Sequence, residues 1–229
     1  YEPYDLSIFQ NVRYFQLEIE DYPTLSGSLL FENLFYLALG CNGELFNCSY
    51  FPNLRFLRLI SADVVCEVSF PCNLELADFQ SCYLYDLSVL SNVKELIFDD
   101  CRGRGFGNVN ALANASRITF HEIKELEDVS SLGRVYELRI TSCSRVKDIS
   151  NLGGVHRLCV EACGITSLEG LGQGNSDILL SALSLSIDFS SLISVYKVTL
   201  QSCDGLVDGR GLSNVHHLIL YCCNNFQDT

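Results

Sequence analysis

The chain has 229 residues, of which 48% are hydrophobic and only 19% are charged, a balance that excludes an intrinsically disordered tail. Its 28 acidic residues outnumber the 15 basic ones and give a formal charge of -13. Because an acidic chain repels phosphate backbones and anionic lipids, the composition argues against nucleic acid as the partner.

A ladder of apolar residues repeats along the whole chain. In its clearest copy, Val135 to Val155, apolar residues stand at offsets 0, 3, 5, 8, 11, 14, 17 and 20 from Val135. The ladder predicts a single domain over residues 1–229, with about ten stacked repeats and cut mid-repeat at both ends. The residue at offset 0 recurs every 19 to 22 residues, at Val12, Leu34, Leu54, Leu74, Val93, Ala115, Val135, Val155, Asn175, Val195 and Val215.

Each copy predicts one short strand and one return segment. Offsets 2 to 6 alternate between polar and apolar residues, as in 137–141, which is typical of a strand with one buried face. Because the strands recur in the same direction, the sequence predicts a parallel sheet. The return segment is too short for a full α-helix, and its Asp-x-Ser triplets, such as Asp148-Ile149-Ser150, predict a turn of 3₁₀ helix.

Two insertions and one long apolar segment stand out along the chain. The two longest steps carry insertions at Asp21–Ser28 and Arg102–Gly107, and the second, rich in Gly and Arg, is predicted to be a mobile loop rather than an RNA-binding patch. The apolar segment Ile178–Val195 keeps the repeat register and contains Asp188 and several serines, so that no membrane insertion is predicted.

The cysteines divide into two equal groups. Six share offset 8, where a small polarizable side chain is predicted to pack in the core: Cys82, Cys101, Cys143, Cys163, Cys203 and Cys223. The others contain no C-x-x-C pair, so that neither a metal site nor any other cofactor is predicted: Cys41, Cys48, Cys66, Cys72, Cys159 and Cys222. We therefore expect reduced thiols in a cytoplasmic or other reducing compartment, with a virus particle as an alternative location.

The pattern L-x-L-x-x-C-x-x-V/I-x-D-I/V-S-x-L-G-x-V resembles that of leucine-rich-repeat proteins, and it is similar to internalin-like arrays and to arrays of protists and large DNA viruses. The resemblance implies a mostly β, α/β solenoid: a right-handed horseshoe with a parallel sheet on the concave face and 3₁₀, turn and extended segments on the convex face. It also implies protein recognition. Four copies lack Cys or Asn at offset 8, where the ladder is expected to loosen: Glu20, Ala62, Ile123 and Leu183.

The column at offset 2, on the predicted exposed face of the sheet, has a charged part and an apolar part. Its charges alternate in sign at Glu95, Arg117, Glu137, Arg157, Asp177 and Lys197. We interpret them as a structural ladder that fixes register, with a charged docking stripe as the alternative. The apolar part is Tyr14, Tyr36, Phe56 and Leu76, with Ile60 nearby at offset 6. These side chains are either partner-binding residues or residues covered by a terminal cap.

A third candidate surface is acidic. Asp99, Asp100 and Glu122, with Glu161, stand at offsets 6 and 7. They favour binding of a basic partner surface, and the alternative is that they form a solvated face of the sheet with no binding role.

No catalytic arrangement is predicted. None of the four histidines, His121, His156, His216 and His217, has a nucleophile and an orienting acid at motif spacing. The hypothesis is a non-enzymatic scaffold that binds a partner protein through the concave sheet and lateral loops. Two alternatives stay open: a structural subunit locked into a large assembly such as a virus particle, and the substrate-recognition arm of a ubiquitin ligase adaptor.

Overall fold

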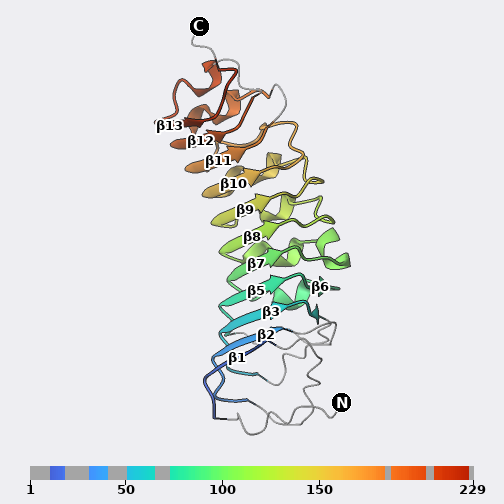
Figure 1. Cartoon of the computed structure of the whole chain (residues 1–229). Helices are drawn as coiled ribbons and strands as arrows, with labels where there is room; N and C mark the ends of the chain where they lie inside the picture. The colour runs from blue at the N-terminus through green and yellow to red at the C-terminus, as the bar shows by residue number, and fades with distance from the viewer. Residues whose placement is uncertain are drawn as a thin grey trace. The chain divides into compact units, whose positions relative to one another are not determined.

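A computed structural model describes residues 11–18, 31–40, 51–64, 73–183, 187–204 and 209–226. They fall into two compact units, Tyr1–Ala115 (unit 1) and Ser116–Thr229 (unit 2). Figure 1 shows the same motif in both, a short strand followed by a return segment. The prediction of a single domain stays a prediction. The predicted insertion at Asp21–Ser28 and Cys41, Cys48, Cys66 and Cys72 lie outside the described residues.

Unit 1 contains a parallel sheet and a small two-stranded sheet. Its large sheet runs in chain order through β1 (Tyr14–Glu18), β2 (Tyr36–Gly40), β3 (Phe56–Ile60), β5 (Leu76–Gln80) and β7 (Glu95–Asp99). The small sheet pairs β4 (Asp63–Val64) with β6 (Tyr83–Leu84). Three 3₁₀ turns are described in this unit: η3 (Ser88–Leu90), η4 (Arg104–Gly107) and η5 (Asn110–Asn114).

Unit 2 repeats the arrangement. Its strands pair in parallel and in chain order: β8 (Arg117–His121), β9 (Glu137–Thr141), β10 (Arg157–Glu161), β11 (Asp177–Ser181), β12 (Lys197–Gln201) and β13 (His217–Tyr221). The described 3₁₀ turns are η6 (Ser130–Leu132), η7 (Ser150–Gly154), η8 (Ser190–Ser194) and η9 (Arg210–Leu212).

The core consists of the apolar ladder. In the repeat that begins at Val135, every apolar rung from Val135 to Val155 is at most 1% exposed. Each repeat buries its own rungs against those of its neighbours, which is how a solenoid obtains a continuous core from short units. Both units therefore have the fold of a leucine-rich-repeat solenoid, and the predicted parallel, mostly β architecture with 3₁₀ return segments is confirmed.

The Asp-x-Ser triplets start 3₁₀ turns, as predicted. The backbone N–H of Ser150 donates to Asp148 Oδ1 at 2.9 Å, and the same bond recurs at Asp86, Asp128 and Asp188. Asn108 replaces Asp in one copy and accepts from the N–H of Asn110 at 3.0 Å. These turns lie within the return segment and direct the chain toward the next strand.

A residue with left-handed backbone, at offset 7, follows each described five-residue strand from β3 on. Ser142 has φ 56°, and its N–H donates to the carbonyl of Glu161 in the next repeat at 2.9 Å. A regular strand would turn offset 7 inward, whereas this conformation places offset 8 in the core. The residues are Ser61, Ser81, Asp100, Glu122, Ser142, Ala162, Ala182, Ser202 and Cys222.

The cysteines at offset 8 form a ladder of thiols that bond to the backbone. Cys101 Sγ, for example, lies 3.2 Å from the carbonyl oxygen of Phe79 in the preceding repeat and 3.4 Å from that of Asp99. Burial raises the pKa of the Cys143 thiol to about 12, so that it stays protonated and able to donate. In copies without cysteine, Ala62, Ile123 and Leu183 are at most 2% exposed, and the expected loosening does not occur there.

The prediction of a mobile loop at Arg102–Gly107 is wrong. Most of this insertion forms η4, and Phe106 is fully buried with its ring edge-on to Phe98 at 5.3 Å between centroids. Gly103 has φ 127°, and a Cβ there would lie 2.1 Å from the carbonyl oxygen of Leu84. The sequence offered one apolar residue, Phe106, as the signal that the insertion packs.

Ile178–Val195 contains β11 and η8 and no long helix among its described residues. Nowhere in the described part of the chain is a helix both long enough and apolar enough to span a membrane.

Candidate functional site

The candidate site is the exposed face of the sheet, formed by offsets 2, 4 and 6. In β9 the odd offsets, Leu138 and Ile140, are fully buried, while Glu137, Arg139 and Thr141 reach the surface. Because paired strands lie about 4.8 Å apart, equal offsets of neighbouring repeats form columns across the sheet. The two units present different columns.

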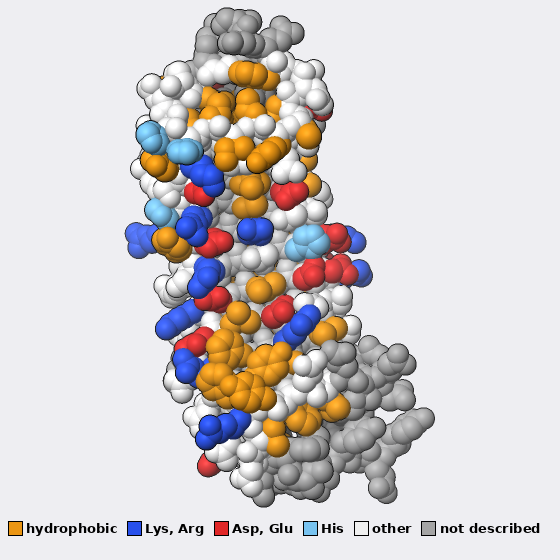
Figure 2. Space-filling view, turned by 60° about the vertical axis from the view of Figure 1, so that its left-hand side comes forward, with side chains coloured by type: hydrophobic (Ala, Val, Ile, Leu, Met, Phe, Trp, Pro, Cys, Tyr) orange, Lys and Arg blue, Asp and Glu red, His pale blue; other side chains and the backbone are white. Residues whose placement is uncertain are grey.

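In unit 1 the predicted apolar residues come together. Register pairing places Tyr14, Tyr36, Phe56 and Leu76 side by side. The aromatic patch, defined here as Tyr14, Phe35, Tyr36 and Phe56, adds one residue from offset 1. Tyr14 is 68% exposed and its ring lies 5.9 Å from that of Phe35 and 6.3 Å from that of Tyr36. Figure 2 shows a continuous hydrophobic surface on this part of the sheet face.

Basic side chains border the aromatic patch. The Arg55 guanidinium lies 5.2 Å from the centroid of the Phe35 ring, where a cation is attracted to the ring face, and it also pairs with Glu75. The Phe35 and Phe56 rings are 5.1 Å apart. The patch is thus held by ring contacts and one cation–π contact.

Ile60 is separated from the aromatic patch along its own strand. Arg58 lies between Phe56 and Ile60 on the exposed face of β3, with Nε 3.5 Å from Asp78 Oδ2. Burial raises the pKa of Asp78, and the Arg58 charge opposes that rise. The predicted site residue Ile60 therefore borders a polar cluster instead of joining the rings.

In unit 2 the predicted charge ladder is in register. Arg117, Glu137, Arg157, Asp177 and Lys197 face one another in turn across β8 to β12. An ion pair joins Lys197 Nζ to Asp177 Oδ2 at 3.0 Å, whereas Arg157 takes part in no ion pair among the residues described. Glu95, at the other end of the predicted ladder, is in β7 of unit 1.

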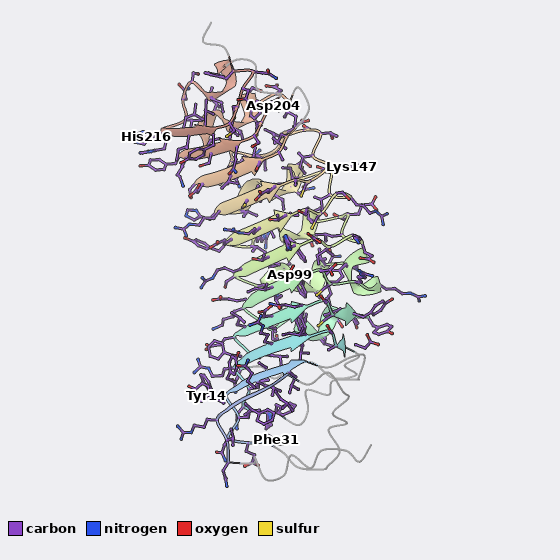
Figure 3. The ribbon with its side chains drawn as sticks, in the orientation of Figure 1. Tyr14, Phe31, Asp99, Lys147, Asp204 and His216 are labelled. Atoms are coloured by element: carbon purple, nitrogen blue, oxygen red, sulfur yellow. The ribbon has the colours of Figure 1, made fainter. Side chains whose placement is uncertain are left out.

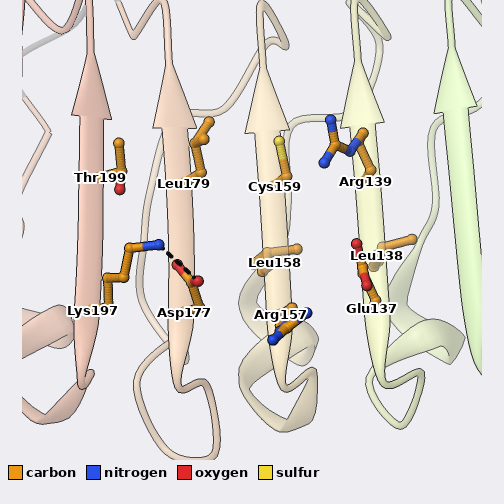
Figure 4. Close-up of a pocket in the computed structure, with 10 residues that line it drawn as sticks. All are labelled: Glu137, Leu138, Arg139, Arg157, Leu158, Cys159, Asp177, Leu179, Lys197 and Thr199. Carbon is orange, nitrogen blue, oxygen red and sulfur yellow. Dashed lines mark hydrogen bonds and ion pairs between the residues drawn. The ribbon is translucent and has the colours of Figure 1, made fainter. Parts of the chain in front are cut away.

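A shallow depression lies above this ladder (Figure 4) and has a volume of about 220 Å³. We call it the charged depression. Cys159, Leu179 and Thr199 line it from offset 4, and burial raises the pKa of the Cys159 thiol. Its lining includes three cations and two carboxylates: Arg139, Arg157, Lys197, Glu137 and Asp177.

The predicted acidic residues are divided between the units. Asp99 ends β7 in unit 1 and Asp100 follows it, with Asp100 Oδ1 3.9 Å from Arg102. Glu122 follows β8 in unit 2. Asp100 and Glu122 both have left-handed backbone, so these two positions have a structural role that the sequence analysis did not assign.

The sequence analysis also missed a column of aromatic and imidazole rings at offset 1 of unit 2. Tyr136 stacks on His156 at 4.8 Å, and Tyr196 stacks on His216 at 4.7 Å. His156 Nε2 lies 3.0 Å from Ser176 Oγ, and Figure 3 shows His216 projecting outward beside β13. The recurrence of Tyr and His at one offset was the available signal.

Within the described residues, no group of three or more His, Cys, Asp or Glu side chains is arranged to hold a metal ion. The features of the sheet face are therefore an aromatic patch in unit 1 and a charged depression in unit 2, both open and both suited to non-covalent contact.

No protein-family model and no curated protein matches the chain. Among solved structures, the chain is similar to the functional domain of InlJ from Listeria monocytogenes, described as including a cysteine ladder, with 13% identity and a TM-score of 0.45 over 87% of this chain. The chain spans 60% of the length of that InlJ domain. It is also similar to the internalin InlF from Listeria monocytogenes, with 12% identity and a TM-score of 0.40 over 97% of this chain and 89% of that one.

Proposed function

We propose that this chain is a non-enzymatic interaction module that binds a partner protein through the exposed face of its sheet. The observation that carries the proposal is the aromatic patch. Tyr14 leaves 68% of its surface in water while the rings of Phe35 and Tyr36 lie beside it, and the Phe56 ring lies against that of Phe35.

Energetics favour an interface role for such a patch. Exposed aromatic side chains bury a large area on binding and lose little conformational entropy, so that they are enriched among the residues that dominate binding energy. Arg55 adds a cation held against a ring face, and arginine is enriched in the same way.

The test begins with capture of the partner. A photo-crosslinking amino acid at position 14 is expected to capture the partner from an extract of the source cells, and the same amino acid at position 136 serves as the control. Tyr136 is exposed to 50% but lies in unit 2.

The affinity for the captured partner then tests whether the aromatic patch is the binding site. The double variant Tyr36→Ser/Phe56→Ser is expected to weaken binding about 30-fold, since truncating a hot spot costs about 2 kcal/mol or more. Tyr136→Ser is the matched control and should leave the affinity unchanged. An unchanged affinity of the double variant, with its thermal unfolding intact, would refute the proposal. Stoichiometric recovery in a large particle would instead support the structural-subunit alternative.

A further inference from the structure

The charged depression of unit 2 contains two guanidinium groups that are exposed. Arg139 extends from β9 toward Cys159 on the neighbouring strand β10, and Arg157 lies below Cys159 on the same strand (Figure 4). Among the described residues, neither arginine takes part in an ion pair. Lys197 makes a partly exposed ion pair with Asp177 at 3.0 Å, and because such pairs contribute little, its ammonium group can also bind a carboxylate from another molecule.

The balance of charge around the depression is positive on a chain whose formal charge is -13. Its three cations, Arg139, Arg157 and Lys197, outnumber its two carboxylates, Glu137 and Asp177. A carboxylate from another molecule can lie between the two guanidinium groups, each of which has five N–H donors in a planar fork.

We propose that the charged depression binds an extended acidic peptide segment in polyproline II conformation, which crosses the strands and places a carboxylate at every third residue. The spacing of the cations supports this occupant. Cations at offset 2 line the depression two strands apart, at Arg157 on β10 and Lys197 on β12. Strands about 4.8 Å apart therefore repeat a cation every ~9.6 Å, and three residues of polyproline II span ~9.3 Å.

The apolar floor of the depression fits the same occupant. Cys159 and Leu179 form a half-buried strip beside the charged column, against which proline rings can pack while carboxylates reach the cations. A polyproline II segment also has little conformational freedom to lose on binding.

This inference rests on the proposed function only in that the sheet face binds protein, and it concerns a different surface from the aromatic patch. The experiment therefore uses peptides and variants of unit 2 in the full 229-residue chain. The probe is a fluorescent peptide of four Glu-Pro-Pro triplets. Two controls are a peptide of the same composition with its four Glu consecutive, and a peptide of four Lys-Pro-Pro triplets.

Fluorescence anisotropy at low salt is expected to show the Glu-Pro-Pro peptide binding about fivefold more tightly than the clustered one, and more weakly as salt is added. Arg139→Ala/Arg157→Ala should weaken its binding about tenfold, while Arg139→Lys/Arg157→Lys retains part of it. Arg134→Ala, an exposed arginine outside the sheet, should have no effect, and neither should Tyr36→Ser/Phe56→Ser.

Three outcomes would overturn the proposal: equal binding of the clustered or Lys-containing peptide, equal weakening by Arg134→Ala, and no binding at millimolar peptide. Thermal unfolding of each variant shows that the fold is intact. Since the aromatic-patch variant leaves this assay unchanged, a failure here is distinct from a failure of the proposed function.

Discussion

Asn175 stands at an offset 0 position, where every other repeat has an apolar residue. It is 5% exposed, its amide donates to the carbonyls of Leu152 and Val155 in earlier repeats, and it accepts from the N–H of Gly172. A buried amide is tolerated because all of these bonds are made. Hydrogen bonds to nearby backbone groups thus compensate for the loss of an apolar side chain at this position.

Replacement of Asn175 by the usual valine is expected to destabilise the chain. Asn175→Val restores the apolar pattern but leaves the Gly172 N–H without its partner and removes two bonds between repeats. We expect a loss of about 1–3 kcal/mol, measured as a lower midpoint in urea unfolding. A midpoint equal to or above that of the natural chain would contradict this account.

The left-handed position at offset 7 is also open to a residue-level test. Ala162 has φ 50°, which costs an L-residue roughly 1–2 kcal/mol and costs glycine nothing sterically. Glycine also has greater conformational entropy in the unfolded chain, which offsets part of this gain. The net effect of Ala162→Gly should be to raise the free energy of unfolding by about 0.5–1 kcal/mol. Ala162→Val, which worsens the same clash, should lower it. Equal effects of the two variants would show that offset 7 is not strained.

At the scale of the element, the repeat that begins at Val135 is closed by three backbone devices that act in succession. The left-handed residue follows the strand, the thiol at offset 8 donates to the carbonyl of Phe120 in the preceding repeat, and the Asp-x-Ser turn starts the 3₁₀ helix within the return segment. The first two devices satisfy backbone groups at the end of a strand only five residues long, and the third satisfies the N–H of Ser150 at the start of the 3₁₀ turn. In this repeat the single turn η7 then leads to the next strand.

At the scale of the whole molecule, the Asp-x-Ser turns couple stability to pH. Hydrogen bonds from the side chain and N–H of Ser88 lower the pKa of Asp86, and those of the Ser N–H and hydroxyl lower the pKa of Asp128, Asp148 and Asp188. A carboxyl with a lowered pKa in the folded state contributes stability above its ordinary value of 3.8. That contribution is lost as pH falls through the lowered values.

Replacing these four aspartates by asparagine should remove that acid sensitivity. The amide oxygen can still accept the N–H bond, as Asn108 does in this chain, but it does not titrate. The Tm of the natural chain is expected to fall more between about pH 5 and about pH 3 than that of the fourfold variant. The natural chain and the fourfold variant both contain Asp78, whose carboxyl has a pKa raised by burial and the opposite pH dependence. Its contribution is therefore the same in the two proteins. Parallel Tm curves would refute the assignment.

The sequence by itself determined the repeat, the parallel strands, the offset 8 ladder and the 3₁₀ turns. These follow from contacts between one repeat and the next, which depend on residue type at a fixed period. The register of the offset 2 column and the meeting of Tyr14, Tyr36 and Phe56 follow from the same period.

The tertiary structure decided which side chains are buried, hydrogen-bonded or ion-paired, because these properties depend on distances in space. Phe106 is buried because there is space for its ring beside Phe98. Asn175 is accommodated because two backbone carbonyls of earlier repeats accept its hydrogen bonds. Arg139 and Arg157 stay without an ion pair because no described carboxylate comes within bonding distance of them. Periodicity fixes which residues are neighbours. Whether neighbouring polar groups bond, and whether an insertion packs, depends on distances of a few tenths of an ångström that a linear pattern does not contain.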